Sequence, residues 1–165
     1  MFGFSFEEIF PALGGFIDWC AATWVGVYIH TVTWAFKFIE TVHIVAWVAL
    51  LGATMLVNLR LLGLLRGWSV AQMARSVAIY IYSSLALVLA TGTLLFLSDP
   101  WKYYRNIAFG PKMLFLAMVV LYQFTLYPRA VRAVAEAPLW ARIAALGSLL
   151  MWFYIGAAGR AIAVV

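Results

Sequence analysis

The sequence predicts an all-α integral membrane protein: a four-helix transmembrane bundle preceded by an N-terminal interfacial amphipathic helix. Of its 165 residues, 67% are hydrophobic and only 10% are charged, and the mean hydropathy is +1.01. Soluble domains carry roughly 45–50% apolar and about 25% charged residues, and a chain of this size cannot bury so much apolar surface in one soluble core. We therefore expect residues 1–165 to form a single transmembrane domain.

The first apolar stretch, about residues 10–36, is expected to lie in the membrane interface. It is rich in aromatic residues that favour the headgroup level, namely Trp19, Trp24, Tyr28 and Trp34. Only Lys37 and Phe38 separate this stretch from the next apolar run. Two residues are too few for a turn between two antiparallel spans. We therefore expect an interfacial helix that breaks from the first span near Lys37. The alternative is one long tilted helix.

Four continuous apolar runs are long enough to cross an apolar layer of about 30 Å as helices. They cover about residues 39–65, 76–97, 109–127 and 139–163. Because these runs do not alternate between apolar and polar residues, they do not predict a strand barrel.

The residues that flank the runs predict where the helices begin and end. Ser69 and Gln72 have the spacing of a capping box before the second span. Asp99-Pro100 is expected to end that span, and Gly110-Pro111 to open the third. Pro128 is expected to kink or end the third helix.

The basic residues are interpreted as topology signals. The formal charge is +5, but the Lys and Arg residues are scattered between apolar runs, whereas nucleic-acid binding requires a basic patch or stripe. Six arginines lie in the connections between spans one and two and between spans three and four, and are expected to face the cytoplasm: Arg60, Arg66, Arg75, Arg129, Arg132 and Arg142. Both termini are then outside, as is the 99–110 loop, in which Trp101, Tyr103 and Tyr104 are interpreted as an aromatic belt.

Four ionisable residues fall inside the apolar runs, where charge is costly and marks a candidate site. They are Glu40, His43, Lys112 and Arg160, and the predicted topology places all four in the outer half of the membrane. Polar stripes continue from them along the helices. We expect these stripes to turn toward one another and away from lipid: Trp47, Thr54 and Asn58 on the first span, Ser84, Thr91 and Ser98 on the second, and Gln123 on the third.

These residues are compatible with several functions. His43 can ligate a cofactor metal, with Glu40 orienting the ring and Lys112 and Arg160 neutralising acidic groups of the cofactor. Alternatively, Glu40 forms a buried ion pair with Lys112 or Arg160 that determines helix register. A proton or ion path is a third possibility. His30 is interpreted as an interfacial histidine.

The chain resembles a family of small bacterial inner-membrane proteins of unknown function. The resemblance is carried by Glu40-Thr-Val-His43, Gly52, Asn58-Leu-Arg60-Leu-Leu-Gly63, Gly92-Thr-Leu-Leu-Phe96, a Tyr104, Asn106, Phe109 and Lys112 pattern, and Ala158-Gly159-Arg160. More distantly, the layout is similar to the haem-b protoporphyrinogen oxidase of bacteria and to the membrane domain of copper-resistance D proteins.

The more distant resemblance implies a cofactor site. His43, Arg60-Leu61 and Lys112 match positions of the oxidase family. This match implies that His43 is an axial ligand of haem b and that Lys112 is a propionate or substrate partner. Trp47, on the same stripe of the first span, is a further candidate cofactor-binding residue. The expected function is electron transfer in the periplasmic half of a cytochrome-b-like bundle. The alternatives are a cofactor-free accessory subunit of a larger respiratory or photosynthetic membrane complex, and a copper or proton path. The expected partners are the lipid bilayer and either other subunits of a membrane complex or further copies of the chain in a homo-oligomer.

Overall fold

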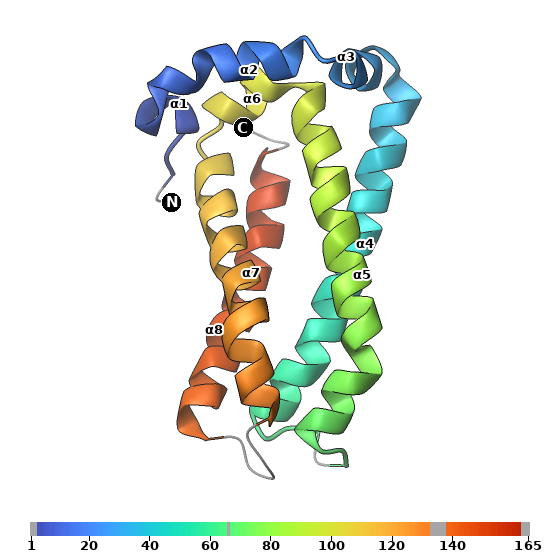
Figure 1. Cartoon of the computed structure of the whole chain (residues 1–165), viewed down its shortest axis with the longest axis vertical. Helices are drawn as coiled ribbons and strands as arrows, with labels where there is room; N and C mark the ends of the chain where they lie inside the picture. Colours follow the sequence, from blue (N-terminus) through green and yellow to red (C-terminus); the bar gives the residue numbers. More distant parts are fainter. Residues whose placement is uncertain (1–2, 66, 133–137, 163–165) are drawn as a thin grey trace.

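The computed structural model describes residues 3–65, 67–132 and 138–162. In these ranges all regular structure is helical. Four long helices run side by side as a bundle (Figure 1), and their bounds are α4 (Thr33–Leu61), α5 (Val70–Ser98), α7 (Phe109–Arg132) and α8 (Leu139–Ile162). Each is long and apolar enough to cross a membrane. The prediction of four apolar helices is therefore confirmed.

The bundle is built from two helix pairs. α4 packs along α5, α7 packs along α8, and contacts between α4 and α8 join the two pairs. The shared core contains fully buried side chains such as Leu50, Val57, Ile81 and Trp152. The outer surface is also apolar, with Ile79 72% exposed and Leu121 67% exposed, as expected of a bundle surrounded by hydrocarbon.

The first described helix and the last turn of the last one lie at the same end of the bundle. The helices that precede α4 and the last turn of α8 lie at one end of the bundle, and the α4–α5 and α7–α8 connections lie at the other (Figure 1). The described arginines of these connections are therefore far from the N-terminal helices. Arg66 lies outside the described residues.

α4 ends four residues before the predicted limit of the first run, and Gly63 explains why. Gly63 has a φ of +89°, a conformation that glycine adopts without a Cβ penalty. The Gly63 N–H donates to the Arg60 carbonyl and the Leu64 N–H donates to the Leu59 carbonyl, which is the hydrogen-bond pattern of a Schellman motif.

The predicted signals of α5 are confirmed. Ser69 and Gln72 form the expected capping box, so α5 begins six residues earlier than the apolar run suggests. Asp99 follows the last residue of α5, and its carboxylate caps a further short helix, α6 (Pro100–Arg105).

Pro128 does not end the third helix, and the prediction that it could do so is wrong. α7 continues through Pro128 to Arg132. Proline removes one backbone donor from the helical ladder, but neighbouring helices and side chains can compensate for such a loss in apolar bundles.

The N-terminal segment forms a layer across one end of the bundle rather than one amphipathic helix (Figure 1). Its elements are α1 (Phe6–Ile9), the 3₁₀ turn η1 (Pro11–Leu13), α2 (Gly14–Ala21) and α3 (Trp24–Thr31). The segment formed by η1 and α2 is bent by 73° relative to α3. Trp19, Trp24, Tyr28 and Trp34 are all exposed, as their predicted interfacial position requires.

The break before the first span lies at Val32, and the prediction of a break near Lys37 is wrong. Val32 has an extended conformation, with φ −99° and ψ 91°, whereas Lys37 lies inside α4. The physical reason is local. Residues 31–33 are all β-branched, which lowers helix propensity, while the Thr31 hydroxyl bonds back to the Val27 carbonyl at 2.8 Å. Lysine is a good helix former.

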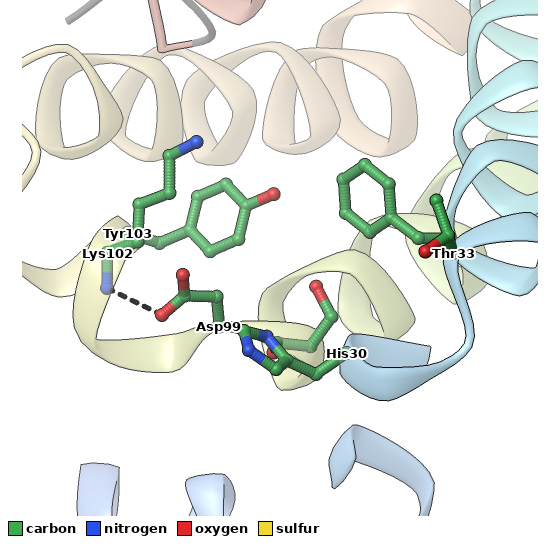
Figure 2. Close-up of a pocket in the computed structure, with 7 residues that line it drawn as sticks. His30, Thr33, Asp99, Lys102 and Tyr103 are labelled. Atoms are coloured by element: carbon green, nitrogen blue, oxygen red, sulfur yellow. Dashed lines mark hydrogen bonds between the residues drawn. The ribbon is translucent and has the colours of Figure 1, made fainter. Parts of the chain in front are cut away.

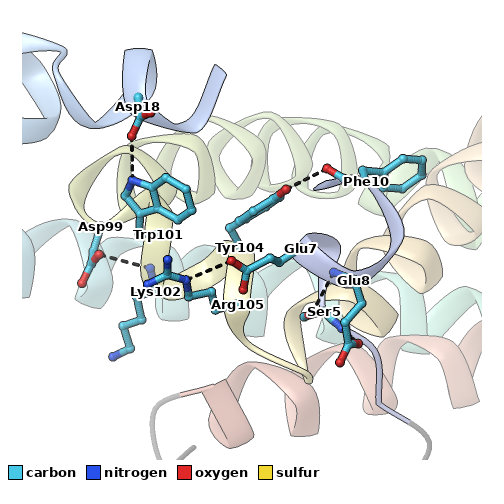
Figure 3. A network of polar contacts seen from close by, with 10 residues as sticks. All are labelled: Ser5, Glu7, Glu8, Phe10, Asp18, Asp99, Trp101, Lys102, Tyr104 and Arg105. Atoms are coloured by element: carbon cyan, nitrogen blue, oxygen red, sulfur yellow. Dashed lines mark hydrogen bonds and ion pairs between the residues drawn. The ribbon is translucent and has the colours of Figure 1, made fainter. Parts of the chain in front are cut away.

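Polar contacts attach this N-terminal layer to α6 (Figure 3). The Tyr104 hydroxyl donates to the Phe10 carbonyl at 2.7 Å, and the Trp101 indole N–H donates to Asp18 at 3.1 Å. Tyr104 is only 2% exposed, so it is not part of an exposed aromatic belt. At α3, Gly26 lies directly against the Leu97 carbonyl of α5, where a side chain would collide.

Cys20 provides a test of this layer. It is buried where α2 packs on the bundle, and burial raises the pKa of its thiol. Because the thiolate is the reactive form, we expect a water-soluble maleimide to label folded protein slowly and denatured protein fully. As a matched control, Glu7→Cys in a Cys20→Ala background should be labelled rapidly. Equal labelling rates at the two positions would contradict the packing of α2.

Candidate functional site

The predicted polar stripes do turn inward. The side chains that the sequence places on three different spans are nearly all removed from the surface: Thr54, Asn58, Ser84, Thr91, Ser98 and Gln123 are buried. Asn58 donates through its side-chain amide to the Ser148 hydroxyl of α8 at 3.2 Å. This confirms the expectation that the polar faces meet inside the bundle.

His43 is held by a hydrogen bond to α5. Its Nδ1 lies 2.8 Å from the Thr91 Oγ1, and the Thr91 hydroxyl itself lies 2.6 Å from the Leu87 carbonyl. A carbonyl only accepts, so the Thr91 proton points to Leu87 and Nδ1 must carry the proton donated to Thr91. In the neutral ring, Nε2 is then left with its lone pair, which is the form of histidine that ligates metals.

Three glycines allow large side chains to approach neighbouring helices in this half of the bundle. A Cβ at Gly92 would lie 3.2 Å from the Cε1 of His43. A Cβ at Gly156 would collide with the indole of Trp47, and one at Gly159 would lie 3.4 Å from the Nζ of Lys112. These glycines are therefore the surfaces on which the predicted site residues rest, since backbones approach most closely where the side chain is smallest.

The remaining predicted site residues take different positions. The Lys112 ammonium is close enough to act electrostatically on the His43 ring. Glu40, one turn away on the same face of α4, acts electrostatically on Tyr103 of α6. Arg160 is exposed on the last turn of α8. Among the described residues, Glu40 forms no ion pair with Lys112 or Arg160, so the ion-pair alternative finds no support in the described contacts.

Several buried polar atoms lack a hydrogen-bond partner within the described part of the chain. They belong to three helices of the bundle and are the indole nitrogens of Trp47 and Trp152, the Asn58 Oδ1, the Gln123 Nε2 and the hydroxyls of Tyr122 and Tyr127. Buried polar groups are normally satisfied. The Trp47 nitrogen is relevant to the site because Trp47 lies one helical turn from His43.

A second polar site, which the sequence patterns did not predict, lies between the α3–α4 and α5–α6 junctions. It is a cavity of about 240 Å³ lined by His30, Thr33, Phe36, Ser98, Asp99, Lys102 and Tyr103 (Figure 2). The available signal was Asp99-Pro100, which caps and opens α6 and so places Lys102 and Tyr103 one turn further on.

The hydrogen bonds of this cavity define which groups face a ligand. His30 Nδ1 lies 2.9 Å from the Ser98 carbonyl and must be the donor, so its neutral ring leaves Nε2 as an acceptor. Burial, with the nearby Asp99 and Glu40 carboxylates, raises the pKa of Tyr103 to about 12. The phenol therefore remains a hydrogen-bond donor at neutral pH.

The described residues contain no cluster of three or more His, Cys, Asp or Glu side chains that could hold a metal ion. A metal-containing group at His43 would therefore be held by that residue alone, or together with ligands other than a cluster of His, Cys, Asp or Glu side chains.

The Thr91 hydroxyl can be tested by isosteric replacement. Thr91→Val removes the hydroxyl that accepts the His43 Nδ1–H in a partly buried site, and this should lower the free energy of unfolding by about 1–3 kcal/mol. Thr91→Ser retains the hydroxyl and should lose much less. The measurement is thermal or denaturant unfolding in detergent, together with ¹⁵N NMR of the histidine rings. A Val variant that keeps the Nδ1–H tautomer at full stability would disprove the assigned role of Thr91.

The close approach of Trp47 to Gly156 can be tested on one helix. Gly156→Ala forces the indole away from α8, and such overpacking should cost about 1–3 kcal/mol of stability. Gly147→Ala is the matched control, because nothing lies within 4 Å of a Cβ there; its higher helix propensity should stabilise by up to about 1 kcal/mol. Unfolding of both variants in one detergent gives the comparison. Equal stability of the two variants would refute the predicted collision.

The comparisons with known proteins identify a family but no function. No curated protein and no solved structure matches the chain, and the resemblances to the protoporphyrinogen oxidase and to copper-resistance proteins therefore stay predictions. A family model described as "Family of unknown function (DUF6644)" matches residues 13–165. The chain belongs to this family of unknown function, DUF6644.

Proposed function

We propose that this protein is a small cytochrome-b-like membrane protein that holds a haem, or a related redox cofactor, at His43 for electron transfer. The observation that carries the proposal is the orientation of His43. Its Nδ1–H is bound by Thr91, so Nε2 keeps its lone pair in a half-buried position inside the bundle. An imidazole oriented through its other nitrogen is the common arrangement of a metal-ligating histidine.

The groups around His43 suit a haem chemically. The Lys112 ammonium can neutralise a propionate, and the Trp47 indole nitrogen is a buried donor without a partner in the described structure. Gly92 and Gly159 lie beside His43 and Lys112. When bound, haem supplies a one-electron couple, and the histidine ligand and its burial tune the potential. Arg160, exposed on the last turn of α8, is a further candidate partner for a propionate at the rim.

We also propose that the four helices cross the bacterial inner membrane with the N-terminal layer on the periplasmic side. The described arginines of the α4–α5 and α7–α8 connections lie at the end opposite to this layer, and cytoplasmic loops are enriched in Lys and Arg. The His43 site then belongs to the periplasmic half.

A second candidate function is a cofactor-free accessory subunit of a larger membrane complex. The specific observation in its favour is that side chains of the protein itself already pack against the three glycines. His43 covers Gly92, Trp47 covers Gly156 and Lys112 covers Gly159. In this case the polar residues determine how the helices pair, because polar contacts and small residues provide specificity between helices in lipid.

A reduced-minus-oxidised visible spectrum of the purified protein, with pyridine haemochrome quantitation, separates the two candidates. We expect a haem b spectrum near one haem per chain and its loss in His43→Ala. His30→Ala is the control, since it removes the other histidine of the chain, and should retain haem. A folded wild-type protein with a flat spectrum would refute the haem proposal and favour the accessory subunit, whereas full haem content in His43→Ala would refute the ligand assignment.

A further inference from the structure

The cavity between the α3–α4 and α5–α6 junctions carries unpaired charges of both signs. Asp99 and Lys102 line the same cavity, and among the described residues neither forms an ion pair. Within the described part of the chain, the Asp99 carboxylate accepts only the backbone N–H of Lys102, at 3.2 Å. Figure 2 shows that the Lys102 side chain extends away from this carboxylate. A ligand can therefore meet a negative and a positive group within one cavity.

The neutral groups of the cavity likewise include both hydrogen-bond acceptors and hydrogen-bond donors. His30 Nε2 is an acceptor, because its Nδ1 is used on the Ser98 carbonyl. Tyr103 brings a hydroxyl that can donate, whereas Thr33 lies on the side of the cavity opposite to Lys102 (Figure 2). The acceptors suit a primary ammonium group, and the Tyr103 donor together with Lys102 suits a phosphate or carboxylate.

The volume and the position of the cavity further limit the kind of ligand that can bind there. A volume of about 240 Å³ lies below the range of about 300–1,000 Å³ typical of drug-sized ligands. The cavity lies where α4 begins and α5 ends, beside the exposed Trp34 of the first turn of α4. Tryptophans gather at the headgroup level of membranes. Phe36 and Tyr103 are the aromatic residues of the lining. The acceptors of Asp99 and His30 can bind the N–H groups of a primary ammonium, whereas a quaternary ammonium has no N–H to donate.

From these contacts we infer that this cavity binds a zwitterion with a primary ammonium and an anionic group, of the phosphoethanolamine class. The ammonium binds at Asp99 and His30, and the anion binds at Lys102 with the hydroxyl of Tyr103. The source is either the headgroup of phosphatidylethanolamine or a free zwitterion. This inference requires the proposed membrane insertion only for the lipid source, and it does not depend on haem.

Thermal unfolding of the full chain, delipidated in detergent, tests the inference. The probes are short-chain phosphatidylethanolamine, phosphatidylcholine and phosphatidylglycerol, and free phosphoethanolamine. We expect saturable stabilisation by the ethanolamine lipid at concentrations where the choline and glycerol lipids have little effect. Equal stabilisation by all three lipids would overturn the inference, and so would the absence of stabilisation by any ethanolamine probe. Free phosphoethanolamine that binds as tightly as the lipid would support the site and identify a soluble ligand.

Two charge-removing variants show whether the named residues form the site. Asp99→Asn removes the charge but keeps a good helix cap, and Lys102→Gln removes the ammonium of an exposed side chain. Each should weaken ethanolamine-lipid binding about tenfold or more, as expected when a charged hydrogen bond is lost. Lys37→Gln, an exposed lysine of α4 outside the cavity, should bind like the wild type. Wild-type affinity in both site variants, with folding verified by circular dichroism, would refute the assignment.

Discussion

The pairing of most polar groups inside an apolar bundle is the constraint on which this structure depends, and the exceptions among the described residues are buried atoms such as those of Trp47 and Gln123. Its outer surface is apolar along the four long helices, and in hydrocarbon neither backbone nor polar side chains could rely on water there. Helices satisfy the backbone, and side chains such as Asn58 and Ser148 bond to each other across the bundle. The same constraint explains why His43 is bound to Thr91, since a buried ring nitrogen without a partner would be costly.

The candidate site at His43 depends on glycines as much as on its ionisable residues. Gly92, Gly156 and Gly159 come from two helices, and each lies under a side chain from another helix. In an apolar solvent, helices associate mainly through close packing and interhelical hydrogen bonds. The small residues therefore position the larger ones, and the chemistry proposed for His43 and Lys112 is tied to the way in which α4, α5, α7 and α8 pair.

The N-terminal layer creates a second environment at the end of the bundle. The chain turns at Val32 and again at Asp99, and the His30 hydrogen bond to Ser98 joins these turns. These turns place polar side chains, such as Thr33 beside Val32 and the capping Asp99, at the end of the apolar bundle. The cavity lined by Asp99, Lys102 and Tyr103 is a consequence of this meeting, and it explains how ionisable groups far apart in sequence come to share one site.

The sequence by itself determined the four apolar helices, the Ser69–Gln72 cap and the inward direction of residues such as Thr54 and Gln123, because these follow from hydrophobic runs, local capping and helical periodicity. It misplaced the break at Val32 and the end of α4, where β-branched residues and a left-handed glycine outweigh hydropathy. Only the tertiary structure decided that Thr91 binds His43, which glycine each large side chain covers, and that His30 binds the Ser98 carbonyl. Those contacts join residues 47 or more positions apart, and a single helix periodicity carries no information about which faces of different helices meet.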